Sequence, residues 1–425
     1  MCDQSQRARP IVVVTGAGVL TSLGMGQVDN WAKLSAGQSG IRRITRFAVD
    51  GLHTTIAGTI DFVRVEPLCT PELCERSAEA AIEEALSKAA IGSRGNFPGP
   101  LFLGIPPFEM EWPQRRALAA AAARDRTVDY DSLLHAAVSG CFGAVDERFR
   151  HGSVAENLRD RFGTRGSPVS VTTACASGAT AIQLGVEAIR RREADAALCV
   201  GTDASVNPEA LIRFSLLSAL STRNDPPAAA SKPFARNRDG FVMAEGAGAL
   251  ILESLEAAKA RGAAILGVIA GCGETADSFH RTRSSPNGKP IIDSMRKAIE
   301  DAGVLPEQID YINAHGTGTP ENDKMEYLGV SAVLGGRVGN VPISSNKSMI
   351  GHTLSAAGAI EAIFTLLTLE HQRLPPTANY QVPDPEIPLD VVPNVARDAR
   401  VRCAMSNSFG FGGQNVSLVL TREPA

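Results

Sequence analysis

The chain has 425 residues, of which 44% are hydrophobic and 21% are charged, and its formal net charge is −4. This composition excludes a disordered or fibrous protein, and the lack of a basic excess argues against a nucleic-acid partner. A chain of this length is long enough for one large core or for two fused halves.

Short β-branched runs alternate with helical stretches along the chain, which is typical of an α/β protein. Strands are expected at Ile11–Thr15, Val169–Thr173, Ala197–Gly201, Ala249–Leu252, Leu266–Ala270, Ile309–Asn313, Pro342–Ser345, Arg402–Met405 and Val416–Leu420. Helices are expected over Glu75–Ala90, Gly178–Arg191, Ile291–Ala302 and Ser355–His371. The stretch 92–165 mixes proline, glycine and charge with short helical patches, and we interpret it as an insertion or cap.

Two distant segments repeat one pattern, in which a strand leads through small residues into a long helix. The first is Val169–Thr173 followed by Cys175–Arg191, and the second is Pro342–Ser345 followed by Ser355–His371. Such an internal repeat predicts two topologically related halves. We place them at 1–263, which includes the cap at 92–165, and at 264–425.

The cysteines and the apolar runs indicate the cellular compartment of the protein. The eight cysteines are scattered without a CxxC pair, which favours reduced thiols over a disulfide scaffold or a zinc ribbon. The polar N-terminus does not resemble a signal peptide. The longest apolar candidate, Leu354–Leu369, is interrupted by Glu361, so no membrane span is expected. We therefore predict a cytoplasmic protein.

Cys175 is a candidate nucleophile. Ala179, Ile182, Val186 and Ile189 recur at helical spacing, so a helix should begin near this cysteine. Unpaired N–H groups and the positive end of the helix dipole favour the thiolate, which is the nucleophilic form. The alternative is a small buried thiol with no chemical role.

Three further segments place polar or glycine-rich residues directly after predicted strands, where α/β proteins hold ligands. They are Ile312–Pro320 with His315, Ser344–His352 with Lys347 and His352, and the glycine- and aromatic-rich Ser406–Asn415. Alone, each histidine could be structural and each glycine run a turn. Four such segments together favour a functional site, and the histidines lack the short spacing of a metal site.

Together the segments resemble the β-ketoacyl-acyl carrier protein synthases, the condensing enzymes of the thiolase superfamily. The resemblance lies in TACASG around Cys175, AHGTGTP at 314–320, NKSMIGH at 346–352 and SNSFGFGG at 406–413, all in family order. It extends through IVVVTGAGVLTSLG near the start, LSTRND at 220–225 and RDGFVMAEGAG at 238–248. With two histidines at these positions, the chain resembles the group of synthases that elongates medium to long acyl chains.

The resemblance implies a five-layered α-β-α-β-α fold of two duplicated halves, usually assembled as a homodimer. It implies that Cys175 accepts an acyl group from a carrier-protein thioester. His315 and His352 would then stabilise the enolate formed by decarboxylation of a malonyl thioester. Lys347 would maintain the electrostatics of the site, with Glu326 as its partner.

Other residues take supporting roles by the same resemblance. The backbone N–H groups of Cys175 and Phe411 would form the oxyanion hole, and Phe411 would also be the gate of the pocket. Thr317 and Thr319 would contact the phosphopantetheine arm. Ile105 and Phe411 would line the acyl pocket.

The reaction implied is a decarboxylative Claisen condensation that yields a 3-oxoacyl-carrier thioester and CO₂ in fatty acid elongation. No resident cofactor or metal is expected, because the phosphopantetheine arm arrives on the carrier and the malonyl group brings its own leaving group. The alternatives are a polyketide-type ketosynthase subunit and a non-catalytic chain-length partner that binds the carrier. The presence of Cys175 argues against the second alternative.

Two features concern specificity. Gly104-Ile105 is followed by Pro106-Pro107, where relatives usually have two glycines, so the pocket wall should differ and the acyl specificity could be for long or very long chains. The carrier is expected to be acidic and to need a local basic patch. Candidates are Arg42, Arg43, Arg46 and Arg64, unless these are ordinary solvated arginines.

Overall fold

The structure is a computed structural model that describes residues 9–92, 94–123, 128–139 and 142–423. Cys2 and Cys141 lie outside the described residues.

Within this part of the chain, eleven strands form one continuous mixed sheet. Its strands are β1 (Val12–Thr21), β2 (Gly24–Met25), β5 (Leu101–Gly104), β6 (Val169–Val171), β7 (Ala196–Asp203), β8 (Gly246–Ser254), β9 (Gly267–Ala276), β10 (Tyr311–Asn313), β11 (Ile343–Ser344), β14 (Cys403–Phe409) and β15 (Gln414–Thr421). Two small sheets pair β3 (Arg42–Arg43) with β4 (Ile56–Ala57), and β12 (Arg373–Leu374) with β13 (Arg397–Asp398).

The large sheet contains the same strand pattern twice. Its order is β6-β5-β7-β8-β1 in one half and β11-β10-β14-β15-β9 in the other. In each half the first three strands run parallel and the last two pair antiparallel. A short antiparallel pairing of β1 with β9, at Val13 with Val268 and Val14 with Gly267, joins the halves. The fold therefore consists of two duplicated halves, as the internal repeat indicated.

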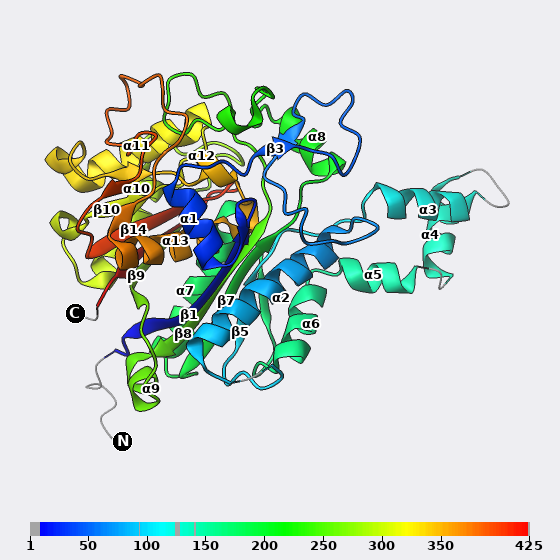
Figure 1. The fold of residues 1–425 in the computed structure, drawn as a ribbon. Helices are drawn as coiled ribbons and strands as arrows, with labels where there is room; N and C mark the ends of the chain where they lie inside the picture. Colours follow the sequence, from blue (N-terminus) through cyan, green and yellow to red (C-terminus); the bar gives the residue numbers. More distant parts are fainter. Residues whose placement is uncertain (1–8, 93, 124–127, 140–141, 424–425) are drawn as a thin grey trace.

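Helices separate and cover the two strand sets, which gives the five layers (Figure 1). The helices α7 (Ser177–Arg190) and α13 (Ala357–His371) pack on each other and contact strands of both halves. On the outer faces, α2 (Thr70–Ala89) packs on β1, β7 and β8, while α10 (Lys289–Ala302) packs on β9 and β15 and against α11 (Pro320–Leu334). Every residue of β1, β7 and β8 is buried, because layers cover both faces of the sheet.

The remaining helices are shorter. They are α1 (Gln27–Ser35), α3 (Trp112–Ala122), α4 (Tyr130–Val138), α5 (Gly143–Phe149), α6 (Ser153–Phe162), α8 (Pro208–Leu216), α9 (Leu255–Ala260) and α12 (Lys347–Ile350). Single 3₁₀ turns over Ala174–Ala176 and Leu354–Ala356 directly precede α7 and α13.

The cap expected at 92–165 is narrower than predicted. Leu101–Gly104 forms β5, a fully buried strand between β6 and β7, and α6 packs on α2 and β5. The four-residue strand was missed because it is short and flanked by prolines. Only α3, α4 and α5 project from the body, beyond the end of α2 (Figure 1). We call these three helices the arm.

Two glycines allow α7 and α13 to approach closely at their N-terminal ends. A Cβ atom on Gly178 would lie 2.7 Å from the backbone nitrogen of Ala359, and one on Gly358 would lie 2.5 Å from that of Ala179. A side chain at either position would separate the helices, which carry the N-terminal turns of both halves. None of the described helices is long and apolar enough to cross a membrane.

Candidate active site

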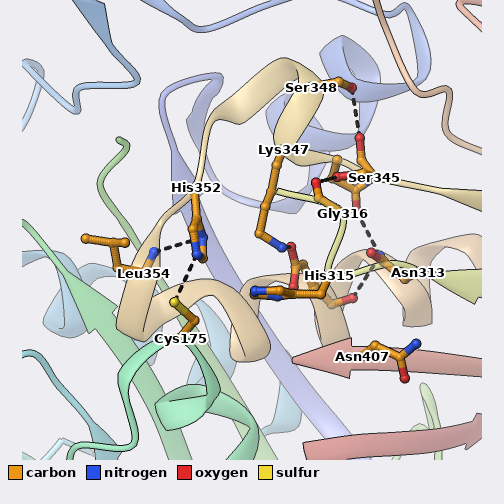
Figure 2. Close-up of polar contacts among 12 residues, drawn as sticks. Cys175, Asn313, His315, Gly316, Ser345, Lys347, Ser348, His352, Leu354 and Asn407 are labelled. Atoms are coloured by element: carbon orange, nitrogen blue, oxygen red, sulfur yellow. Dashed lines mark hydrogen bonds and ion pairs between the residues drawn. The ribbon is translucent and has the colours of Figure 1, made fainter. Parts of the chain in front are cut away.

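The N-terminal turns of α7 and α13 have matching backbones. Ala174 precedes Cys175 with a φ of 48°, and Leu354 follows His352 with a φ of 45°, although neither is glycine. Left-handed backbone at a non-glycine residue costs free energy and is concentrated at functional sites. The matching turns bring Cys175 of the first half beside His352 of the second (Figure 2).

Cys175 lies partly exposed in the 3₁₀ turn before α7. Desolvation by the surrounding protein raises the pKa of its thiol to about 11, although the charge of Lys347 and the backbone N–H of Phe411 lower it. The position of Cys175 at a helix N-terminus predicts the opposite, a thiol whose thiolate is favoured. The pKa of the thiol is raised nonetheless, because desolvation outweighs the stabilising groups.

His352 contacts the nucleophile directly, with its Nε2 at 3.1 Å from Cys175 Sγ (Figure 2). Its Nδ1 accepts a hydrogen bond of 3.3 Å from the backbone N–H of Leu354. Because Nδ1 is an acceptor, the proton of the neutral ring is on Nε2, which faces the sulfur. His352 is therefore arranged as a hydrogen-bond donor toward the reacting atoms.

His315 follows β10 and packs edge-to-face on His352, with ring centroids 5.3 Å apart. Both rings are only 2% exposed. Burial lowers the pKa of both imidazoles well below its ordinary value, and the positive charge of Lys347 lowers it further. Both rings are therefore neutral at pH 7 and can act as uncharged donors.

Lys347 is the first residue of α12 and is buried. Its ammonium forms an ion pair with Glu361 of α13, which is also buried. Burial raises the pKa of Glu361 to about 7, while the Lys347 charge and hydrogen bond lower it. Glu326, the partner that the resemblance implies for Lys347, makes no ion pair with it among the described residues, although the charge of Lys347 lowers the pKa of Glu326.

Glu326 instead holds the backbone that carries His315. Its Oε1 accepts from the backbone N–H of His315 at 2.8 Å, and its Oε2 accepts from that of Gly316 at 2.6 Å. The side chain of Asn407 also donates to Oε1, at 3.3 Å. Burial raises the pKa of Glu326 to about 7, against the lowering effect of these N–H donors. Glu326 is thus a positioning residue for His315.

Glu361 is the site residue that the sequence analysis missed. It was noted only as the charge that interrupts an apolar run. A single charge within a continuously buried helix needs a partner, since burying an unpaired charge is costly. That reasoning would have singled out Glu361, although not which cation it meets.

Phe411, Thr317 and Thr319, to which the resemblance assigns the gate and the pantetheine contacts, follow the strands β14 and β10. Phe411 is half-buried, and its backbone N–H is near enough to the Cys175 sulfur to lower the pKa of that thiol. The hydroxyls of Thr317 and Thr319 are 2.9 Å apart, and Thr319 also caps α11 by accepting from the backbone N–H of Asn322.

Ile105 lies directly after β5 and is fully buried. The preceding Gly104 abuts the backbone of Ser177 and Gly178 at the start of α7, since a Cβ there would lie 2.5 Å from Ser177 C. Ile105 is therefore near the turn that carries Cys175. Of the two prolines that follow it, Pro106 is buried and Pro107 is exposed.

Cys175, His315 and His352 are the residues that could hold a metal, because their ligand atoms all lie within 4.8 Å of one another. Thiolate and imidazole are ligands that suit zinc. The nearby positive charge of Lys347, which lowers the pKa of both histidines, opposes a second cation. The expectation of a metal-free site therefore stays a prediction.

The four arginines proposed for carrier binding differ in their contacts. Arg43 pairs with Asp225, Arg46 pairs with buried Glu245, and Arg42 donates to backbone carbonyls. Arg64 is exposed, and its side chain makes no ion pair within the described part of the chain. Of the four arginines, Arg64 is therefore the one whose positive charge is available to a partner.

The fold and site define a class of protein, in which a cysteine on a helix N-terminal turn and two neutral histidines meet between duplicated α/β halves. Residues 112–258 match the model of the β-ketoacyl synthase N-terminal domain, and residues 266–381 match that of the C-terminal domain.

Full-length relatives agree with these matches. The 3-oxoacyl-acyl-carrier-protein synthase 2 of Coxiella burnetii is 36% identical, over 97% of this chain and 98% of its own. The tetracenomycin polyketide synthase ketoacyl synthase alpha subunit of Streptomyces glaucescens is also 36% identical, over 98% of each chain.

Solved structures show the same similarity. A type II polyketide ketosynthase in complex with its acyl-carrier protein has a TM-score of 0.87 at 31% identity, covering 98% of this chain and 100% of that one. A β-ketoacyl synthase from Burkholderia phymatum has a TM-score of 0.83 at 32% identity, with the same coverage. The chain belongs to the β-ketoacyl synthase family, and its fold is thiolase-like.

Proposed function

We propose that this β-ketoacyl synthase condenses an acyl group held on Cys175 with a malonyl-carrier thioester in fatty acid elongation. The products are a 3-oxoacyl-carrier thioester and CO₂. The observation that carries this proposal is the convergence of the Cys175 thiol with two neutral imidazoles, one of them 3.1 Å from the sulfur.

The first step is acyl transfer to the enzyme. The Cys175 sulfur attacks the carbonyl of an acyl-carrier thioester, the bond to the pantetheine sulfur breaks, and the proton of Cys175 ends on that sulfur. We propose that the backbone N–H of Phe411, which lowers the pKa of the Cys175 thiol, donates to the carbonyl oxygen of the acyl group that forms there.

The second step produces the carbon nucleophile. The carbon–carbon bond to the malonyl carboxylate breaks, CO₂ leaves, and the electron pair develops as an enolate on the thioester oxygen. His315 and His352 donate to that oxygen. A donor aimed at a developing oxyanion is commonly worth about 3 kcal/mol. A neutral imidazole can fill this role, because it still has one ring N–H to donate.

In the third step the enolate carbon attacks the acyl carbonyl on Cys175. The tetrahedral intermediate then expels the Cys175 thiolate, which takes up a proton. Lys347 contributes positive charge beside the site, held in place by Glu361. We propose that Thr317 and Thr319 bind the arriving phosphopantetheine arm, and that Ile105 and Phe411 line the acyl pocket. No resident cofactor or metal is required by these steps.

The partners we propose are an acyl carrier protein and a second copy of this chain. One structural relative is a ketosynthase in complex with its carrier protein. For the dimer, β6 is at the open end of the sheet, and the arm exposes Tyr130, Leu134 and Val138 along one face of α4. The cytoplasmic location remains a prediction.

The test is intact-protein mass spectrometry after incubation with acyl-carrier thioesters of increasing length. We expect an acyl adduct on the wild type and on Cys272→Ala, a control at another partly exposed thiol, but not on Cys175→Ala. The dependence of adduct formation on acyl-chain length would show which chain lengths the acyl pocket accepts. An adduct that persists in Cys175→Ala, or none with any donor, would contradict the proposal.

A polyketide ketosynthase is the second candidate, because relatives of that kind are as similar to this chain as the fatty acid enzymes. The same residues would perform the same condensation. Repeated malonyl addition without reduction between rounds would support the polyketide assignment, whereas a single condensation per reduced acyl chain would support elongation.

A further inference from the structure

We propose that the loop Asp277–Ser285, at the rim of the active site, is a docking contact for an acidic acyl carrier protein, through Phe279, Arg281 and Arg283. We call it the docking loop. This inference rests on the proposed function and names the surface that its carrier partner would touch.

The docking loop is attached to the loop that contains Phe411. The backbone N–H of Gly412 donates to the carbonyl of Arg281 at 2.8 Å, and the backbone N–H of Asp277 donates to the carbonyl of Gly413 at 2.8 Å. Phe411 reaches the sulfur of Cys175 with its own backbone N–H. The docking loop therefore lies beside Phe411, which the proposed function places at the acyl pocket.

Asp277 holds the docking loop in one conformation. Its buried carboxylate accepts from the backbone N–H of Ser285 at 2.7 Å, from the Ser285 hydroxyl at 2.7 Å and from the backbone N–H of Phe279 at 2.9 Å. Little conformational entropy would then be lost when a partner binds, which favours affinity.

The exposed side chains of the docking loop combine apolar surface with uncompensated positive charge. Phe279 is 55% exposed. Arg281 and Arg283 are exposed, and neither guanidinium makes an ion pair or hydrogen bond within the described residues. No aspartate or glutamate occurs from residue 278 to residue 292. An exposed aromatic side chain flanked by arginines is a combination enriched at protein interfaces.

An acidic carrier protein is the occupant that fits this surface. We take Phe411 as the gate that the phosphopantetheine arm passes, so the folded body of the carrier stays outside and covers the rim. Positive charge at that rim would steer an acidic partner toward the mouth, even though the whole chain carries a net charge of −4. Arg42, Arg43 and Arg46 are less suited, because their side chains are already engaged.

The test compares two acyl donors, a bacterial type II acyl carrier protein and free pantetheine, each loaded with the same dodecanoyl or hexadecanoyl chain. Acylation of Cys175 is followed by mass spectrometry. The variants are Arg281→Glu with Arg283→Glu, and the control Arg400→Glu. Arg400 is an exposed arginine before the start of β14, whereas the active site lies at the other end of that strand.

We expect the ratio of kcat/KM for the carrier donor to that for the pantetheine donor to fall about fivefold to tenfold in the double variant. The ratio should stay at its wild-type value in Arg400→Glu. Added salt should lower the ratio in the wild type more than in the double variant, because salt screens exposed charges.

Two results would overturn the docking proposal while leaving the condensing function intact. One is an unchanged ratio in the double variant, and the other is an equal loss with both donors, which would indicate a disturbed Phe411 loop. Failure of both donors to acylate the wild type would overturn the proposed function itself, and the docking proposal with it.

Discussion

At the residue scale, the site combines groups whose charges are suppressed by burial. The Cys175 thiol has a raised pKa of about 11, and the pKa of both histidines is lowered. The resting site is therefore a thiol beside two neutral imidazoles.

The alkylation rate of Cys175 by iodoacetamide should follow this raised pKa. Only the thiolate reacts, so we expect the rate to rise about tenfold per pH unit between about pH 7 and about pH 10. The measurement is labelling kinetics by mass spectrometry, with Cys175→Ala as the background from other thiols. A rate already constant above neutral pH would mean that the helix N-terminus holds a preformed thiolate.

The Lys347–Glu361 pair should be important for stability as well as for electrostatics. Replacing Glu361 with Gln leaves a buried ammonium without a counter-charge, and we expect the free energy of unfolding to fall by about 3 kcal/mol. Chemical denaturation measures it. The double variant Lys347→Met with Glu361→Gln removes the unpaired charge and should recover part of that loss, whereas decarboxylation of malonyl-carrier should stay impaired. A single variant as stable as the wild type would contradict this role.

At the element scale, the reacting groups depend on the close approach of α7 and α13. Cys175 belongs to the turn before one helix, and His352 lies two residues before the turn that precedes the other, so the Sγ–Nε2 distance depends on how closely the two helices pack. Their contact through Gly178 and Gly358 therefore controls the geometry of the site.

Gly358→Ala should disturb both stability and catalysis. The new Cβ would lie 2.5 Å from the nitrogen of Ala179, so one helix must shift, at a cost of about 1 to 3 kcal/mol. We expect lower stability, measured by denaturation, and a slower condensation rate. Gly336→Ala is the matched control, because nothing lies within 4 Å of its added Cβ. Equal behaviour of the two variants would show that the helix contact tolerates an added methyl group.

At the scale of the whole molecule, the arm is a part that the single chain leaves largely uncovered. Ala122 is the one buried residue of α3, Ser132 that of α4, and α5 has none, among the residues described. Tyr130, Leu134 and Val138 recur at intervals of four residues, so they form one exposed apolar stripe. A second copy of the chain that covers this stripe and the open edge of β6 would explain why both surfaces are exposed in the single chain.

We therefore expect the wild type to be a dimer and Leu134→Glu with Val138→Glu to be largely monomeric, because a dimer would bury two charges in each copy. Light scattering after size exclusion gives the mass. The control is Leu216→Glu, at a leucine that is 81% exposed on α8 of the main body. A monomeric wild type, or a dimer unaffected by the arm substitutions, would contradict this assembly.

Much of the fold and most of the site could be predicted from the sequence. Strong apolar runs and glycine-rich turns are local signals, and Cys175, His315, Lys347 and His352 each follow a strand. Short β5 was missed because four residues carry too little periodicity to distinguish them from a loop. Its place between β6 and β7 depends on long-range pairing that no local pattern encodes.

The sequence by itself determined the α/β class, the internal repeat, the candidate nucleophile and both histidines, since each rests on neighbouring residues or recurring motifs. Only the tertiary structure decided that Lys347 pairs with Glu361, that Glu326 holds the His315 backbone, and that burial raises the Cys175 pKa. These facts depend on which side chains from separate elements meet in the folded chain and on how much water they lose. Both are properties of packing, and neither is carried by the order of residues along one segment.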